Sequence, residues 1–184
     1  KEYGITDIGM NLFHLPDIIT DYFGNGEKKG IKLTFRKEEI LLGTSGAINQ
    51  FRDWIDKEDF LVVYGDNYFH LDYNNLFDRF DKTPESIATV CLQHSKVLTG
   101  KGLVVINRNG AITAFVEKPE HPEKYCTDLI NAGIYCMKNK ILEYIPQGVF
   151  SDYSKDIFPA LLKYNQIMSS YIIKEPLTDI GTIE

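Results

Sequence analysis

Two acidic residues, Asp66 and Asp179, each stand where a predicted strand gives way to a loop. Asp66 follows Gly65 at the end of the apolar run 60–64, and Asp179 begins an Asp-Ile-Gly-Thr sequence. In open α/β sheets, ligands gather at the carboxyl ends of the strands, and carboxylate oxygens hold Mg²⁺ beside phosphate groups. The pattern therefore allows a magnesium site, although each segment alone is at least as typical of a simple turn.

A pair of opposite charges, Glu117 and Lys118, ends another predicted strand and is followed by Pro119. A lysine ammonium can neutralise a phosphate group as a point charge, and a glutamate can accept hydrogen bonds from sugar hydroxyls. The same pair also fits a solvated strand end, because Lys and Glu are mostly exposed in folded proteins.

Two glycines, Gly43 and Gly46, flank the hydroxyl side chains of Thr44 and Ser45 just before a predicted helix. Glycine lets backbone N–H groups approach a ligand closely, and the start of a helix favours anions. The alternative is an ordinary helix start, with Thr44 or Ser45 as the N-cap.

The elements that must position these residues alternate between strand-like and helix-like patterns. Apolar, β-rich runs predict strands over 5–12, 31–36, 60–64, 87–92, 103–106, 111–116, 129–137 and 168–173. Helical spacing of apolar residues predicts helices over 16–23, 47–55, 76–80, 141–145 and 154–162, the last with Ser154 as a candidate cap. The continuous apolar run 60–64 is typical of a central strand covered on both faces. Asn109-Gly110 predicts a tight hairpin turn, so we expect an α/β fold with a mixed sheet.

Composition and charge argue against nucleic-acid-binding and membrane-spanning proteins. The 184 residues carry a net charge of −6 without a basic stripe, so nucleic-acid binding is not expected. No apolar run is long enough to cross a membrane and no secretory signal opens the chain, which predicts a cytoplasmic protein with no membrane partner. Three cysteines (Cys91, Cys126 and Cys136) lack metal-type spacing and are expected to be buried thiols.

Read in order, six segments resemble one family, the sugar-1-phosphate nucleotidyltransferases. They are L-G-T-S-G-A at 42–47, G-D-N at 65–67, F-V-E-K-P at 115–119, N-A-G-I-Y at 131–135, D-I-F-P-A-L at 156–161 and D-I-G-T at 179–182. The order and spacing of the six segments are more specific than any one of them. The resemblance implies a Rossmann-like, three-layer α/β/α fold with a mixed, mostly parallel sheet. Residues 1–184 would form one partial nucleotidyltransferase domain, truncated at the N-terminus and lacking its first βα unit.

The resemblance also implies an activity. A nucleotidyl group would pass from a nucleoside triphosphate to a hexose- or heptose-1-phosphate, giving an NDP-sugar and pyrophosphate. The implied contacts are the nucleotide base for Gly43, Thr44 and Gly46, the sugar for Gly102, Glu117 and Asn131, the sugar phosphate for Lys118, and Mg²⁺ for Asp66 and Asp179. Asp66, Lys118 and Asp179 would be the catalytic residues. The metal would offset the repulsion between two anionic reactants, and no covalent nucleophile is required.

One part of the family pattern is absent from the sequence. The glycine-rich G-x-G-T-R loop, which wraps the triphosphate, and the P-K pair that follows it do not occur in the 184 residues. These residues alone are therefore expected to be severely impaired in activity or inactive. Among the nucleotides, the form of segments 42–47 and 179–182 weakly favours guanylyl transfer, as in mannose-1-phosphate and heptose-1-phosphate guanylyltransferases.

Other functions were weighed against this one. A non-catalytic subunit of the same fold, which senses sugar nucleotides or regulates a partner, stays open, as does a homo-oligomer. A glycosyltransferase would be favoured by an Asp-x-Asp metal motif, which Asp66-Asn67-Tyr68 does not supply. An NAD-dependent dehydrogenase is disfavoured because no G-x-G-x-x-G follows a strand.

Overall fold

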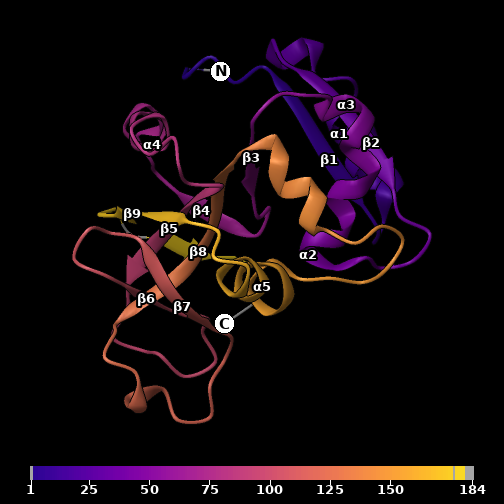
Figure 1. Ribbon diagram of the computed structural model, residues 1–184. Coiled ribbons are helices and arrows are strands. Elements are labelled where there is room, and N and C mark those ends of the chain that lie inside the picture. Colours follow the sequence, from indigo (N-terminus) through magenta and orange to yellow (C-terminus); the bar gives the residue numbers. More distant parts are fainter. Residues whose placement is uncertain (1, 176, 181–184) are drawn as a thin grey trace.

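The computed structural model describes residues 2–175 and 177–180, apart from the side chains of Phe69, Leu177 and Asp179. The strands are β1 Asp7–Leu12, β2 Lys32–Lys37, β3 Phe60–Val63, β4 Asn67–Phe69, β5 Ala88–His94, β6 Leu103–Ile106, β7 Ile112–Val116, β8 Leu129–Met137, β9 Met168–Ile173 and β10 Leu177–Asp179. The α-helices are α1 Pro16–Phe23, α2 Gly43–Gly46, α3 Arg52–Ile55, α4 Tyr73–Asp81 and α5 Phe158–Lys163 (Figure 1). Every predicted strand has a counterpart, whereas β4 and β10 were not predicted.

Three of the predicted helices are 3₁₀ or π-helical over part or all of their length. The helix expected over 141–145 is the 3₁₀ turn Asn139–Tyr144, and a 3₁₀ turn, Ala47–Phe51, joins α2 to α3. A π-helical turn, Tyr153–Ile157, precedes α5. Single π-helical turns are rare and occur often at functional sites.

The main sheet is covered on both faces. Its strand order is β7-β6-β8-β5-β9, with β3 also paired to β8. Along β8, Ile134 and Cys136 point into one core and Tyr135 and Met137 into the other, because successive side chains of a strand alternate between faces. Helix α4 covers the first core through Leu76, and α5 covers the second (Figure 1). The expected three-layer arrangement is confirmed.

The expectation of a mostly parallel sheet is wrong for the described residues. In the main sheet only β5 and β9 pair in parallel, while β3–β8, β5–β8, β6–β7 and β6–β8 are antiparallel. Parallel neighbours need a long connection, and here the chain between β5 and β9 runs through β6, β7, β8 and α5. Strands β6 and β7 are instead joined by the predicted tight turn, where Gly110 has φ 77° and donates its N–H to Asn107 O.

Strands β1 and β2 form a separate parallel pair, connected through α1. Gly9 of β1 lies against the helical segment 47–55. A Cβ at Gly9 would come within 2.7 Å of the Phe51 ring, so glycine permits this approach. Trp54 Nε1 also donates a hydrogen bond to Asp7 Oδ1 at 3.3 Å. The two-stranded ribbon is thereby attached to the rest of the molecule.

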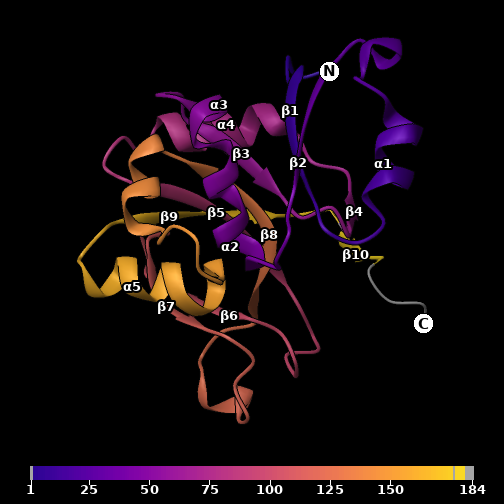
Figure 2. The same ribbon diagram turned by 90° about the vertical axis from the view of Figure 1, so that its right-hand side faces the viewer.

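A cavity of about 790 Å³ is lined by residues of both β1 and β3. Apolar side chains make up most of its wall, among them Ile8, Ile48, Phe51, Trp54, Phe60, Leu61 and Val62. Within the described part of the chain, β1 pairs only with β2 and β3 only with β8, so one edge of each faces no strand. Figures 1 and 2 show β1 and β2 beside the main sheet and not within it. The prediction that 60–64 is a central strand is therefore wrong for the described residues, where β3 is an edge strand. Its two faces pack against the two cores, through Val62 on one side and Leu61 on the other.

The cysteines differ in burial. Cys91 and Cys136 lie in the core beneath α4, as expected. Cys126 is exposed, so the expectation of a buried thiol is wrong there. It lies in the loop between β7 and β8, where no periodic apolar pattern directs side chains inward.

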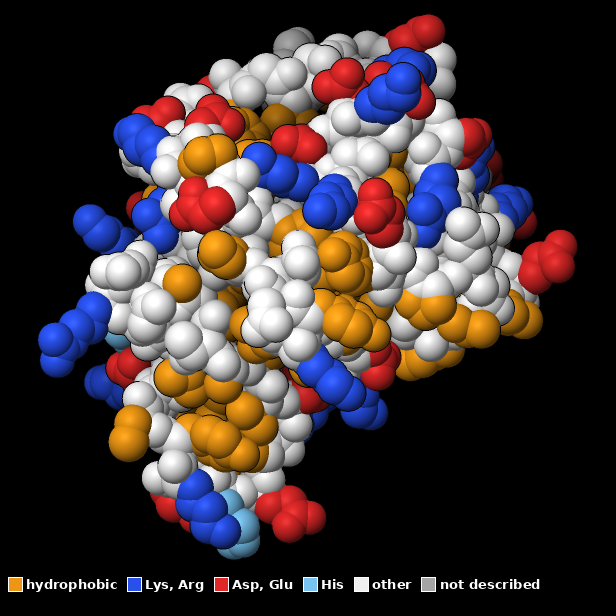
Figure 3. All heavy atoms as spheres, in the orientation of Figure 1, with side chains coloured by type: hydrophobic (Ala, Val, Ile, Leu, Met, Phe, Trp, Pro, Cys, Tyr) orange, Lys and Arg blue, Asp and Glu red, His pale blue; other side chains and the backbone are white. Residues whose placement is uncertain are grey.

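The charged surface is mixed. On the face shown in Figure 3, basic and acidic side chains are interspersed, and apolar side chains are exposed between them. This face carries no continuous basic stripe, which matches the pattern of the sequence.

Candidate functional site

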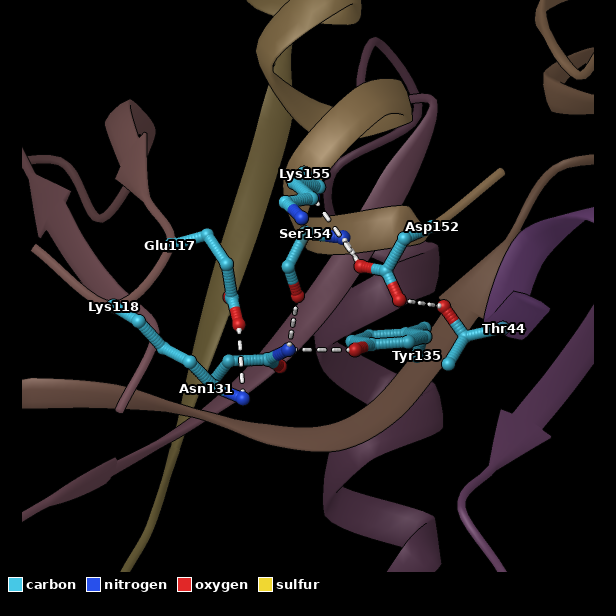
Figure 4. Close-up of polar contacts among 8 residues, drawn as sticks. All are labelled: Thr44, Glu117, Lys118, Asn131, Tyr135, Asp152, Ser154 and Lys155. Atoms are coloured by element: carbon cyan, nitrogen blue, oxygen red, sulfur yellow. Dashed lines mark hydrogen bonds and ion pairs between the residues drawn. The ribbon is translucent and has the colours of Figure 1, made fainter. Parts of the chain in front are cut away.

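Asn131 of β8 is the hub of a hydrogen-bonded cluster (Figure 4). Its Nδ2 donates to the Tyr135 hydroxyl at 2.7 Å and to Ser154 Oγ at 2.9 Å. Its Oδ1 accepts from the backbone N–H of Gly133 at 3.1 Å. The side chain is thereby fixed from three directions, and its amide sits half-buried at the end of the sheet.

Two tyrosines next to this cluster are uncharged near neutral pH. Burial raises the pKa of Tyr64 to about 12, against a smaller lowering by hydrogen bonds with Thr44 and Tyr135. Burial also raises the pKa of Tyr135 well above its ordinary value. Both phenols therefore act as neutral hydrogen-bonding groups behind Asn131.

Glu117 lies over Gly102 in the same place. A Cβ at Gly102 would lie 2.7 Å from Glu117 Oε2 and 3.9 Å from the Cβ of Asn131, so only glycine leaves room for the carboxylate. The Gly102 carbonyl also accepts from the backbone N–H of Asn131 at 3.0 Å. Glycine at 102 thus packs Glu117 and Asn131 into one site.

The charge of Glu117 is balanced by neighbouring lysines. Lys118 Nζ lies 3.8 Å from Glu117 Oε1. Burial raises the pKa of Glu117; Lys118 opposes this rise, Asp152 adds to it and Lys155 opposes it. Lys118 itself has φ 43°, in the left-handed region that non-glycine residues rarely adopt. Backbone strain of this kind is concentrated at functional sites.

Asp152 joins the segment around Thr44 to the π-helical turn. Thr44 Oγ1 donates to Asp152 Oδ2 at 2.7 Å and accepts from Tyr153 N at 3.1 Å. Asp152 Oδ1 accepts from the N–H groups of Ser154 at 2.9 Å and Lys155 at 3.3 Å. Asp152 is therefore the N-cap of this turn. The expectation of Ser154 as cap is wrong, because its hydroxyl accepts from Asn131 instead.

The glycines of segment 42–47 meet another part of the same chain. Gly43 has φ 78°, and a Cβ there would collide with the carbonyl oxygen of Ser151. A Cβ at Gly46 would lie 2.8 Å from Val149 O. The backbone N–H of Gly46 donates to Ser151 O at 3.2 Å. Both glycines therefore permit close packing of loop 149–151, and base binding by Gly43, Thr44 and Gly46 stays a prediction.

The expectation that Thr44 or Ser45 caps the helix is wrong. Helix α2 begins at Gly43, and Leu42 stands at the N-cap position without a side-chain hydrogen bond. The Thr44 hydroxyl is turned to Asp152, and Ser45 Oγ donates to Ser151 Oγ at 2.7 Å. Bonding to loop 149–152 takes the hydroxyls that a cap would have used.

The backbones around Asp66 and Asp179 lie side by side. Strands β4 and β10 pair antiparallel with Asn67 opposite Asp179, and Ile180 N donates to Asp66 O at 2.7 Å. The Asp66 side chain is exposed. The side chain of Asp179 lies outside the described part of the structure. Two segments far apart in sequence are therefore neighbours at the end of β3.

The end of β3 is also connected to the hydrogen-bonded cluster around Asn131. Asn67 Nδ2 donates to Ala132 O at 2.9 Å, next to Asn131. Within the part of the chain that the structure describes, no three His, Cys, Asp or Glu side chains are grouped as a metal site. Magnesium is commonly held by only one or two carboxylates together with substrate phosphates, and the exposed carboxylate of Asp66 is a donor of that kind.

The structure brings some predicted residues together and adds others. Gly102, Glu117, Lys118 and Asn131 share one site, and Thr44 reaches it through Asp152. Sequence reasoning missed Tyr135, Asp152, Ser154 and Lys155 as members of this site. The signal for one of them was present, since aspartate is as strong an N-cap as serine.

No helix among the described residues is long and apolar enough to cross a membrane.

Comparison with known proteins gives consistent results. Residues 2–184 match the family model described as "Nucleotidyl transferase". The chain is 30% identical over 176 residues to a UTP–glucose-1-phosphate uridylyltransferase of Synechocystis sp., with 88% of the chain and 45% of that protein covered. It is 29% identical over 182 residues to a mannose-1-phosphate guanylyltransferase of Mycobacterium tuberculosis, with coverages of 98% and 50%. The chain thus spans about half the length of these curated relatives.

A solved structure, HddC from Yersinia pseudotuberculosis, superposes with a TM-score of 0.79 at 27% identity. The match covers 98% of this chain and 75% of that one. The same protein complexed with GMP-PN gives a TM-score of 0.78 at 26% identity.

Proposed function

The chain belongs to the nucleotidyl transferase family, and we propose that it supplies the sugar-phosphate side of a sugar-1-phosphate nucleotidyltransferase. The enzyme would join a hexose- or heptose-1-phosphate to the nucleotidyl group of a triphosphate and release pyrophosphate. The observation that carries this proposal is the clustering of Glu117, Lys118 and Asn131 around Gly102. That cluster combines a carboxylate and an amide, which suit sugar hydroxyls, with a cation, which suits a phosphate.

Each side chain of the cluster has a task in this scheme. Glu117 accepts hydrogen bonds from sugar hydroxyls and so fixes the orientation of the ring. The amide of Asn131 is held in place by Tyr135 and Ser154. Its side-chain oxygen has a second lone pair, which accepts a hydrogen bond from a hydroxyl of the same ring. Lys118 holds the sugar phosphate so that its oxygen is aimed at the α-phosphorus. Such positioning is a large part of catalysis in phosphoryl transfer.

Asp66 and Asp179 are proposed to hold Mg²⁺. The adjacency of their backbones and the exposure of the Asp66 carboxylate support this assignment. When bound, the ion would neutralise charge on the triphosphate and its leaving group. Without a G-x-G-T-R loop in the 184 residues, we expect no pyrophosphate release by these residues alone.

Guanine is the base we propose first. The support is the form of segments 42–47 and 179–182 together with the guanine-nucleotide complex of a structural neighbour. Other relatives are named for uridylyl and thymidylyl transfer, so the test also includes the triphosphates of those bases. A cytoplasmic location, a homo-oligomer and the absence of nucleic-acid partners stay predictions. The relatives are named as transferases, so the catalytic function is retained over the regulatory one.

The test is a thermal-shift panel of common triphosphates and sugar 1-phosphates with and without Mg²⁺. A ligand at a hundred times its Kd should stabilise the native state by about 2.7 kcal/mol. Asp66→Asn should remove the Mg²⁺-dependent part of the shift with the triphosphate. Asp21→Asn, at an exposed position on α1, is the matched control. Equal Mg²⁺ dependence in the Asp66 variant and the control would rule out the metal assignment.

A further inference from the structure

Lys155 is a cation of the site that the proposed scheme does not use. It belongs to the π-helical turn and directly follows Ser154, whose hydroxyl accepts from Asn131. In Figure 4 the Glu117 carboxylate lies between Lys118 and Lys155. Among the described residues, no acidic side chain forms an ion pair with the Lys155 ammonium. The ammonium is exposed and available to a ligand.

The backbone under Lys155 is held firmly. Its N–H donates to Asp152 Oδ1 at 3.3 Å, and Asp152 N donates in return to Asp156 Oδ2 at 2.8 Å. These reciprocal bonds resemble a capping box, which fixes the first turn of a helix. The base of the Lys155 side chain is thus fixed beside Asn131, while its four-carbon stem keeps the reach of a flexible point charge.

The charge balance of the site calls for a second cation. Three carboxylates, Glu117, Asp152 and Asp156, lie around the cluster, and Lys118 is already 3.8 Å from the first of them. A phosphate monoester carries nearly two negative charges at neutral pH, because its second pKa is about 6. With Lys118 alone these named groups carry three negative charges against one positive charge, and Lys155 raises the positive count to two, which lowers the repulsion that the phosphate meets.

We propose that Lys155 is a second phosphate-binding residue, which holds the phosphate of the sugar 1-phosphate together with Lys118. This inference rests on the proposed function and adds to it a basis for choosing sugar phosphates over free sugars. Hydroxyl recognition lies with Glu117 and Asn131, so the two lysines should affect only the charged part of the ligand. Their contribution should weaken with salt, as for any exposed charge pair.

The experiment measures binding of glucose 1-phosphate, mannose 1-phosphate and glucose to the 184-residue protein by NMR titration. Lys155→Met should weaken binding of the sugar phosphate it accepts by about ten- to hundredfold, the range for lost hydrogen bonds to charged groups. Its affinity for the free sugar should not change. Lys155→Arg should retain most of the phosphate-dependent affinity, and Lys163→Met, at an exposed position of α5, should bind like the unaltered protein.

The outcomes separate this inference from the function itself. If Lys118→Met and Glu117→Gln weaken binding of the sugar phosphate but Lys155→Met does not, the role of Lys155 is refuted and the proposed function stands. Equal losses for free sugar and sugar phosphate in Lys155→Met would also refute it, since they would indicate a structural effect. If the unaltered protein binds neither of these hexose 1-phosphates nor a heptose 1-phosphate, both proposals fail.

Discussion

Replacing Gly102 with alanine should weaken ligand binding at this site while leaving the free energy of unfolding almost unchanged. The new Cβ would lie 2.7 Å from Glu117 Oε2, so the carboxylate must retreat until the contact reaches about 3.4 Å, where ordinary van der Waals distances begin. Gly102 has no positive φ, so alanine causes no strain in the backbone there. The obstructing atom is the end of a flexible side chain, which can move at small cost.

The expected effect on stability is therefore small. Alanine restricts the unfolded chain and alone would stabilise the protein by about 0.4–1 kcal/mol, which offsets the displacement of Glu117. The expected effect on function is large. In catalysis, misplacement of a reacting group by an ångström costs on the order of a hundredfold in rate. By the same geometric argument, we expect the displaced carboxylate to weaken sugar-phosphate binding about tenfold.

Gly43→Ala is the comparison that makes the reasoning testable. Its Cβ would meet the backbone oxygen of Ser151, which cannot turn aside, and φ 78° forces alanine into the left-handed region. We expect a loss of stability of about 2 kcal/mol or more. Urea denaturation and titration with sugar phosphate measure both quantities. A Gly102→Ala protein that binds normally, or one that is destabilised as much as Gly43→Ala, would refute the explanation.

Three further predictions concern single side chains. Thr44→Val removes the exposed 2.7 Å bond to Asp152 and should lower the free energy of unfolding by about 0.5–1.5 kcal/mol in urea, whereas Thr44→Ser should retain most of it; equal stability of both variants would contradict this. Burial raises the pKa of Glu117, so the native state binds its proton more tightly and stability falls as the pH rises from the ordinary pKa through the raised one. Glu117→Gln should then be the more stable protein at neutral pH in thermal denaturation, with the difference vanishing below about pH 4; a difference independent of pH would argue against this cause. Cys126 alone should react quickly with a thiol reagent, and the two buried thiols only after unfolding; a second fast thiol in the native protein would contradict the burial pattern.

Local patterns predicted the elements better than their pairing. Runs such as 103–106 and the Asn109-Gly110 turn identify their own structure, because the side-chain period and the turn residues are local properties. Strand direction depends on which connections are long enough to cross the sheet. That is a property of the whole chain, so the mostly parallel sheet was predicted wrongly.

The candidate site shows the same limit. Glu117, Lys118 and Asn131 were found because they belong to segments that resemble a family pattern. Asp152 was missed because its partner Thr44 is distant in sequence, and only folding brings the hydroxyl within 2.7 Å of the carboxylate. The glycines at 43 and 46 were identified as special, but the reason for their presence, contact with loop 149–151, could not be read from the segment itself.

The edges of β1 and β3 that have no strand partner among the described residues affect how these 184 residues are expected to behave in solution. Backbone amides that face the apolar cavity lack the inter-strand partners that slow hydrogen exchange, and the β1–β2 ribbon has its own sheet. Such a unit opens at lower free energy than the core around β8. Open strand edges beside apolar surface also invite edge-to-edge association between molecules. The ribbon is thus the region where this protein is expected to exchange first, and the two open edges are where it is expected to self-associate.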